Sequence, residues 1–143
     1  MRTIIAVFAF LLVSTLTAQA KEKAICDASG ACANKSSNVE YKDCLYKLAE
    51  EQDKELNVLY KKVRAMLRDD FDKVETSAPK IWPQIRDAQR NWIKFRDNQC
   101  SGEASIAQGG TAAGGWYSDC LCRLTHQRND NLRFILKSWG PQQ

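Results

Sequence analysis

Six cysteines constrain the fold of this 143-residue chain more than any other feature of its sequence. They stand at Cys26, Cys32, Cys44, Cys100, Cys120 and Cys122. An even number of cysteines in an exported protein predicts disulfide bridges, because the compartments outside the cytoplasm are oxidising. A zinc site is the alternative, but Cys120-Leu121-Cys122 is closer than the usual ligand spacing, and His126 is the only histidine. We therefore expect disulfides and no metal.

The first twenty residues are typical of a secretory signal peptide. Arg2 supplies positive charge, ten apolar residues follow at 4–13, and Ala18-Gln19-Ala20 offers small residues for cleavage. A membrane-spanning helix needs about 20 apolar residues, so this shorter run predicts export and no membrane span. A lipoprotein carries its cysteine directly after the cleavage site, whereas five residues precede Cys26 here. We expect a soluble, unlipidated protein in the periplasm or outside the cell.

Residues 21–143 are expected to form a single domain, since 123 residues suffice for one core and hardly for two. Loss of Arg2 leaves 20 of the 21 Lys and Arg residues beside 17 Asp and Glu, a net charge of +3. This small excess does not indicate a nucleic-acid partner. Residues 39–76 hold eight basic and ten acidic side chains, whereas residues 77–143 hold nine and five. One side of the molecule is therefore expected to be mildly acidic.

The first predicted helix begins at a capping box. The Ser37 hydroxyl can accept a free backbone N–H, and the Glu40 carboxylate can reach back to the start of the helix. Steps of three and four residues then give one face that is apolar or aromatic apart from one glutamine. This face consists of Tyr41, Leu45, Leu48, Gln52, Leu56, Leu59, Val63 and Met66.

Two further helices follow in the pattern. Pro83 fits the first turn of the second helix because it lacks a backbone N–H. One face of this helix is expected to carry Ile85, Ala88, Gln89, Trp92, Phe95, Arg96 and Cys100. The third helix is expected to open near Ser118-Asp119, to end at Gly140-Pro141, and to turn inward Leu121, Leu124, Arg128, Leu132 and Ile135. Since no segment alternates with period two, the prediction is an all-α, antiparallel three-helix domain with an irregular N-terminal segment.

A glycine-rich segment at 101–115 is expected to form a flexible or sharply turned loop, with glycine pairs at 109–110 and 114–115. In an antiparallel arrangement this loop and all six cysteines collect at one end of the domain. Six cysteines permit fifteen pairings, among which we favour Cys32–Cys44 and Cys100–Cys120. Closing the second of these loops would contribute on the order of 3 kcal/mol in the chain-entropy account.

Nothing in the sequence requires catalysis or a cofactor. His126 lies inside the third helix without a serine or cysteine nucleophile beside it, and we interpret it as a surface or packing residue. The carboxylates of the first helix alternate with lysines at helical spacing, which is typical of a solvated face. No lysine follows the glycines in the pattern of a phosphate-binding loop. We expect a protein that is not an enzyme.

Polar side chains stand beside the apolar faces of all three predicted helices, and they would have to satisfy one another's hydrogen bonds. They are Asp53, Asn57, Gln89, Arg96, Asp97, Thr125 and Arg128. We interpret this set as an interhelical network that fixes the register of the helices. The alternative is that Arg96 and Asp97 belong to a binding surface.

Four blocks, in order, resemble the lysozyme-inhibitor LprI-like family of bacterial secreted proteins. The segment Cys32 to Cys44, ending in Tyr41-Lys42-Asp43-Cys44, is similar to the family's opening cysteine pair. QDKELNVLY at 52–60 is similar to D-x-x-L-N-x-x-Y, and AQRNWIKFRDNQC at 88–100 to A-Q-x-x-W-x-x-x-R-D-x-x-C. Gly109-Gly110-Thr111, Cys120 and LTHQR at 124–128 resemble the ending G-G-[ST]…C…L-T-x-x-R. Cys26 and Cys122 are additional to the family's four cysteines, which allows a bridge of their own.

The resemblance implies an exported, disulfide-bridged helical protein that binds and blocks lysozyme. A lysozyme acts with two carboxylates in a cleft, which a projecting loop can fill. The candidate partner-binding residues are Gln108, Gly109, Gly110, Thr111, Trp116 and Tyr117. Glycines allow a close approach of the backbone, and the two rings are typical interface anchors. Core packing at the start of the third helix is the alternative interpretation of these rings.

Two other functions stay open. Animal lysozymes are basic, so the net charge of +3 argues against association at long range, although salt screens it beyond about 8 Å. An envelope adaptor without a lysozyme target would instead expose an apolar or charged patch away from the glycine loop. A hydrolase would need a cleft that exposes Asp53 or Asp97 to solvent.

Overall fold

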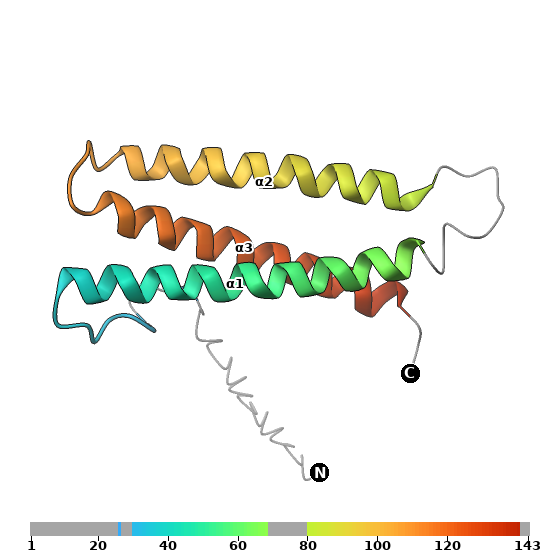
Figure 1. Cartoon of the computed structure of the whole chain (residues 1–143), viewed down its shortest axis with the longest axis horizontal. Helices are drawn as coiled ribbons and strands as arrows, with labels where there is room; N and C mark the ends of the chain where they lie inside the picture. The colour runs from blue at the N-terminus through green and yellow to red at the C-terminus, as the bar shows by residue number, and fades with distance from the viewer. Residues whose placement is uncertain (1–25, 27–29, 69–79, 141–143) are drawn as a thin grey trace, which may run out of the picture.

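The computed structural model describes Cys26, residues 30–68 and residues 80–140. These residues form three helices, α1 (Asn38–Met66), α2 (Ile81–Ser105) and α3 (Ala113–Trp139), and no strand. α2 runs antiparallel to α1 and α3, which lie parallel to each other (Figure 1). The predicted all-α, disulfide-stapled three-helix fold is confirmed. The predicted signal peptide lies outside the described residues and stays a prediction.

Local hydrogen bonds explain where α1 begins. The Ser37 hydroxyl accepts the N–H of Glu40 at 3.2 Å, as the capping pattern predicts. The Glu40 carboxylate turns back one residue further than expected and accepts the N–H and the hydroxyl of Ser36, at 3.1 Å and 2.6 Å. These hydrogen bonds hold the pKa of Glu40 below its usual value.

The predicted inner face of α1 is buried along most of the helix, and the described core divides into two parts along it. At the end of α1 the apolar core consists of Leu56, Leu59, Val63, Met66, Leu67 and Leu132. A smaller cluster near the start of α1 joins Ala49 to Cys26 and Cys122. The core at one end of the domain thus consists of apolar side chains, and bridged cysteines make up most of the smaller cluster at the other end.

α3 is the central helix, because it packs against both α1 and α2 along their lengths. Apart from Cys120, its buried positions recur every three or four residues, as the period of a helix requires. They are small or polar more often than apolar, and comprise Gly115, Ser118, Cys120, Cys122, Thr125, Asn129 and Leu132. The expectation of an apolar inner face built on leucines therefore holds best at Leu132, while Leu121 and Leu124 are half-buried.

The buried face of α2 is narrower than the sequence predicts. Only Gln89 and Cys100 are fully buried on it, with Ile85, Trp92 and Arg96 half-buried. The predicted inward positions of Ala88 and Phe95 were wrong, because both side chains are exposed. The physical reason is that α2 packs mainly against α3. A helix with one close neighbour buries the middle of its apolar face and leaves the flanks in solvent. None of the described helices carries an apolar stretch that could cross a bilayer.

Candidate functional site

All six cysteines are bridged, in the pairs Cys26–Cys122, Cys32–Cys44 and Cys100–Cys120. The last two pairings are those that the sequence favours, and the first is the additional bridge that it allows. The pairs join the segment before α1 to α1 and α3, and the end of α2 to the start of α3. We call the end of the domain where α1 and α3 begin the disulfide end. In the described part of the chain, no group of three His, Cys, Asp or Glu side chains is arranged to hold a metal ion.

The connection between α2 and α3 lies at the disulfide end and is shorter than predicted. α2 continues to Ser105 and α3 already begins at Ala113, so the loop covers only residues 106–112. The expectation of a loop up to residue 115, with a third helix from Ser118, was wrong. The backbone N–H groups of Ile106, Ala107, Gln108 and Gly110 each donate to the carbonyl three residues earlier, which turns the chain tightly. Gln108 and Gly109 have φ of 48° and 78°, the left-handed conformation that glycine adopts without strain.

The packing of Gly115 explains why α3 includes the glycine pair at 114–115. Its position is buried, and a Cβ there would come within 3.4 Å of Lys42 Cγ and 3.8 Å of Leu45 Cδ1 on α1. The missing side chain thus lets the first turn of α3 lie close against α1. This packing outweighs the low helix propensity of glycine.

The expected binding residues divide between the loop and the helix. Gln108, Gly109, Gly110 and Thr111 are exposed in the loop, where Ile106 is also 70% exposed. Trp116 and Tyr117 belong to the first turns of α3 instead. Trp116 is 45% exposed, which does not fit the alternative of core packing for this ring, and Tyr117 is half-buried.

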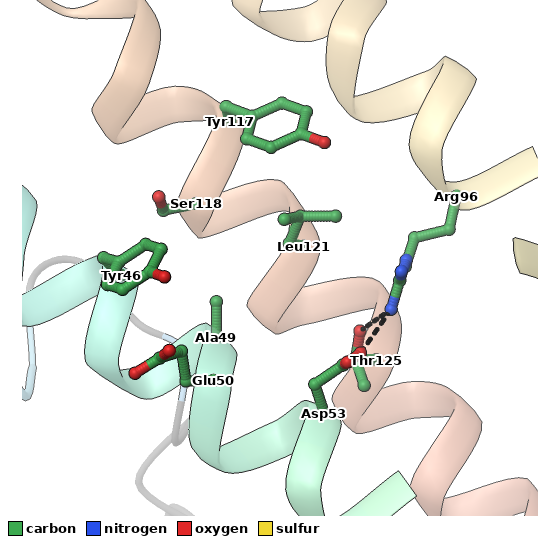
Figure 2. Close-up of a pocket in the computed structure, with 9 residues that line it drawn as sticks. All are labelled: Tyr46, Ala49, Glu50, Asp53, Arg96, Tyr117, Ser118, Leu121 and Thr125. Carbon is green, nitrogen blue, oxygen red and sulfur yellow. Dashed lines mark hydrogen bonds and ion pairs between the residues drawn. The ribbon is translucent and has the colours of Figure 1, made fainter. Parts of the chain in front are cut away.

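Arg96 is the centre of the polar network and ties α2 to both other helices (Figure 2). Its Nη1 donates to Asp53 Oδ1 on α1 at 2.7 Å and to Thr125 Oγ1 on α3 at 3.2 Å. Its Nε donates to Asp97 Oδ1 at 3.0 Å. The side chain of Arg96 is only 13% exposed, whereas those of Asp53 and Asp97 are about half exposed. The structure thus brings together four of the seven residues expected in the network.

The remaining three residues make separate contacts. Arg128 Nε donates to Gln89 Oε1 at 2.8 Å, which joins α3 to α2, and burial lowers the pKa of Arg128. The ring of Trp92 contacts two guanidinium groups, and its centroid lies 5.2 Å from Arg96 Cζ and 5.9 Å from Arg128 Cζ. Asn57 joins no second helix, because its Nδ2 donates to the Asp53 carbonyl one turn earlier in α1.

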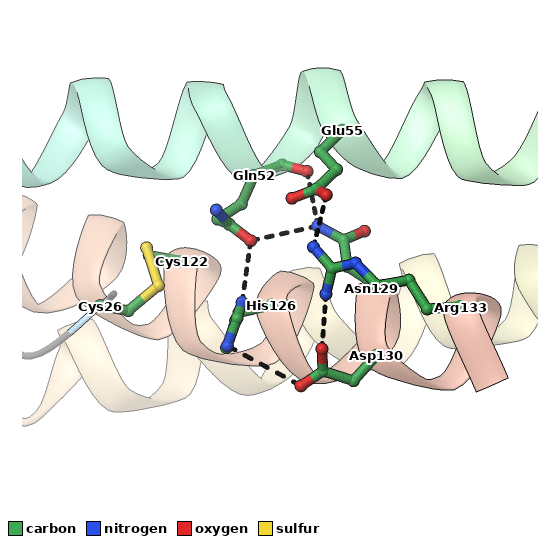
Figure 3. A network of polar contacts seen from close by, with 8 residues as sticks. All are labelled: Cys26, Gln52, Glu55, Cys122, His126, Asn129, Asp130 and Arg133. Carbon is green, nitrogen blue, oxygen red and sulfur yellow. Dashed lines mark hydrogen bonds and ion pairs between the residues drawn. A yellow bond between two sulfur atoms is a disulfide. The ribbon is translucent and has the colours of Figure 1, made fainter. Parts of the chain in front are cut away.

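A second polar network, which the sequence analysis missed, joins α1 to α3 (Figure 3). Gln52 Oε1 accepts from Asn129 Nδ2 and faces His126 Nδ1, both at 3.1 Å. His126 Nε2 lies 3.7 Å from Asp130 Oδ2. Asn129 is fully buried. Gln52 as the one polar residue in an apolar face, together with His126 and Asn129 three residues apart on one helix, could have indicated this network.

A cavity of about 190 Å³ opens between α1 and α3, and Arg96 of α2 lies at its edge (Figure 2). Its lining comprises Tyr46, Ala49, Glu50, Asp53, Arg96, Tyr117, Ser118, Leu121 and Thr125. A second cavity, of about 300 Å³, lies between α1 and α2, and Asp53 and Arg96 line it as well. The ion pair between these two side chains therefore stands between the two cavities.

Asp53 and Asp97, the two carboxylates of the hydrolase alternative, do not form a pair suited to acid–base catalysis. Asp53 is about half exposed and lines both cavities, as the hydrolase alternative requires. However, its Oδ1 accepts from the Arg96 guanidinium, and Asp97 contacts the same guanidinium. General acid catalysis needs a carboxyl group in a dry site that holds its proton. The arrangement here is that of an ion-pair network.

Comparisons with known proteins agree with the blocks seen in the sequence. The family described as Lysozyme inhibitor LprI matches residues 28–132, which include all three helices as far as Leu132. A protein of Rhizobium meliloti (strain 1021), described as uncharacterized, is 30% identical over 89 residues, which cover 60% of this chain and 64% of that protein. The chain thus spans less than two thirds of the length of this relative. No solved structure matches the chain. The chain belongs to the LprI lysozyme inhibitor family.

Proposed function

We propose that this protein is exported through a cleaved signal peptide and binds and inhibits a lysozyme, which protects the peptidoglycan of the cell. The observation that carries the proposal is the family match over residues 28–132. The three disulfides support it, since such bridges persist in oxidising compartments outside the cytoplasm. The family is one of inhibitors, and the ion-paired carboxylates favour a binding protein over an enzyme.

The loop at 106–112 is the part of the molecule best suited to enter an enzyme cleft. Its backbone turns tightly through Gln108 and Gly109. The N–H groups of Gln108 and Gly110 bond within the turn, so the exposed Gln108 side-chain amide is the donor that it offers to the carboxylates of a lysozyme. The bridge Cys100–Cys120 holds both ends of the segment. A connection that is restrained before binding loses less entropy on association than a free one.

Two exposed apolar side chains lie in or beside this loop and would supply contact area. Ile106 is the first residue of the loop, directly after α2, and Trp116 follows the loop in the first turn of α3. Large side chains of this kind dominate the energetics of protein interfaces when a partner covers them. The contact surface of the proposed inhibitor is therefore the loop, which includes Ile106, together with Trp116.

The test is the clearing of a bacterial cell-wall suspension by lysozyme in the presence of purified, oxidised protein. Trp116→Ala and Ile106→Ser should each raise the inhibition constant about tenfold or more, as for residues at the centre of an interface. Phe134→Ser is the matched control, because Phe134 is 65% exposed on α3 far from the loop. It should leave inhibition unchanged. Equal effects of all three substitutions would show that the loop is not the contact surface.

A second candidate function is an envelope adaptor without a lysozyme target. Phe134 and Trp139, both exposed near the C-terminal end of α3, favour it, because they form apolar surface away from the loop. Absence of inhibition of chicken-type, goose-type and invertebrate-type lysozymes at micromolar protein would leave this adaptor function as the better account.

A further inference from the structure

The cavity between α1 and α3 combines aromatic walls with carboxylates. Tyr46 of α1 and Tyr117 of α3 line it from two helices, and Glu50 and Asp53 lie one turn apart along α1 (Figure 2). The carboxylate of Glu50 beside Tyr46 raises the pKa of the tyrosine. Aromatic faces and carboxylates are the two groups that attract a cation in proteins.

The charges around this cavity do not cancel. Arg96 is the one positive side chain in the lining, and it is already paired with Asp53 and with Asp97 behind it. The lining holds two carboxylates, those of Glu50 and Asp53, and one guanidinium, a net charge of −1. With Asp97, which contacts the same guanidinium from outside the lining, the net charge is −2. A negatively charged ligand would be repelled here, and a neutral ligand would gain nothing from the charge.

The wall of the cavity also offers a hydroxyl group to a ligand. Ser118 lines the cavity and keeps only 7% of its surface exposed. Among the described residues, the buried side-chain polar atom without a partner is Asn129 Oδ1. The Ser118 hydroxyl is not such an atom, and as part of the cavity wall it is available to a group that enters the cavity.

We propose that this cavity binds a cationic side chain of the protein partner, and that it takes arginine in preference to lysine. A guanidinium is planar, stacks on a tyrosine ring and offers several donors to carboxylates and hydroxyls, whereas an ammonium is a compact and strongly hydrated charge. The cavity of about 190 Å³ accommodates one such side chain.

The inference rests on the proposed function and deepens it. Animal lysozymes are basic, and the net positive charge of this chain opposes their approach. A local site of charge −2 supplies the attraction that the molecule as a whole lacks. Tyr117 belongs both to this cavity and to the residues that follow the loop, so one partner can contact the loop and the cavity together.

The first experiment measures the dissociation constant for chicken-type lysozyme by calorimetry. Glu50→Gln should weaken binding about tenfold, because it removes a carboxylate from a contact that the partner covers. Glu51→Gln is the matched control, since it removes the same charge one residue further on, where the side chain lines a different cavity. It should change binding less than twofold. Tyr46→Phe should keep affinity and Tyr46→Ser should lose it, as stacking requires.

The second experiment uses a small probe and does not depend on lysozyme. N-acetyl-arginine methylamide should shift the ring signals of Tyr46 and Tyr117 in NMR spectra, and its neutral analogue N-acetyl-citrulline methylamide should not. If the arginine probe binds and lysozyme does not, the cation site stands and the proposed function fails. If lysozyme binds and Glu50→Gln has no more effect than Glu51→Gln, the cation site is overturned and the proposed function stands. Shifts caused by an N-acetylglucosamine trimer and not by the arginine probe would also overturn it, in favour of a saccharide site.

Discussion

Arg96 Nη1 lies 2.7 Å from Asp53 Oδ1, and this ion pair connects α2 to α1 across the groove between them. These two helices otherwise approach each other much less closely than either approaches α3. The same nitrogen reaches Thr125 on α3, so one guanidinium contacts all three helices. This guanidinium therefore fixes the relative position of the three helices at a point along them where the side chains between them are polar.

We predict that Arg96→Ala lowers the free energy of unfolding by about 2–3 kcal/mol, less than for a fully buried ion pair because Asp53 and Asp97 are half exposed. The loss combines hydrogen bonds to two carboxylates with the stacking on Trp92. Urea unfolding followed by circular dichroism measures it. Arg90→Ala on the same helix is the control, since Arg90 is mostly exposed and should change stability by less than about 0.5 kcal/mol. Equal losses for both variants would show that the network does not stabilise the fold.

We predict that the three disulfides stabilise the domain by amounts that follow the length of chain they close. Cys26–Cys122 spans 96 residues and Cys32–Cys44 spans 12. The chain-entropy account gives about 4.7 and about 2.9 kcal/mol for loops of these sizes. Replacing each pair by alanines and measuring urea unfolding should therefore show a larger loss for the first pair. A larger loss for the second pair would mean that native contacts at the bridges outweigh chain entropy.

The sequence predicts the number of helices, the inner face of α1 and the segregation of the cysteines, because periodicity and spacing are local properties of a chain. It does not predict how much of each face a neighbour covers. Phe95 has the correct phase for burial on α2 and is nevertheless exposed, since α2 packs mainly against one helix. The width of the buried face of a helix is determined only by the tertiary arrangement.

The polar residues also divide into contacts that the sequence predicts and contacts that it does not predict. Their spacing predicts that Arg96, Asp53 and Thr125 meet, and the structure brings them together. The network of Gln52, His126 and Asn129 was missed because each residue, taken alone, resembles a tolerated interruption of an apolar face. The cavity between α1 and α3 has no signature in the sequence, since its walls come from helices about 70 residues apart in the chain.

We predict that the contribution of Glu40 to stability depends on pH. Its pKa in the folded protein is lowered by the hydrogen bonds from Ser36. A carboxyl group with a lowered folded-state pKa stabilises the protein above its unfolded-state pKa, and the contribution is lost as the pH falls through the folded-state value. Wild type should therefore exceed Glu40→Gln in the free energy of unfolding at pH 7, and the difference should shrink as the pH falls below the ordinary value of 4.5.

Ser36→Ala provides the control for this pH dependence. It removes the hydroxyl that donates to the Glu40 carboxylate and keeps the carboxylate itself. The difference in stability between Ser36→Ala and wild type should follow the same pH profile. A difference that stays constant between pH 7 and pH 3 would contradict the assignment.

We predict opposite effects for two glycines that the sequence places in one loop. Gly114 lies in the first turn of α3, and a Cβ there would meet nothing within 4 Å. Gly114→Ala should raise the free energy of unfolding by about 0.5–1 kcal/mol, because alanine favours the helix and restricts the unfolded chain. Gly109 has a φ of 78°, so Gly109→Ala should lower the free energy of unfolding by about 1–2 kcal/mol.

Gly109→Asn separates backbone strain from loss of contacts at this position. A Cβ at Gly109 would also meet nothing within 4 Å, so any loss of stability comes from the backbone conformation alone. Asparagine adopts the left-handed region more readily than alanine, and Gly109→Asn should therefore lose less stability than Gly109→Ala. Thermal unfolding of the oxidised variants measures all three effects. Destabilisation by Gly114→Ala would indicate that α3 begins after residue 114 in solution, as the glycine pattern in the sequence suggests.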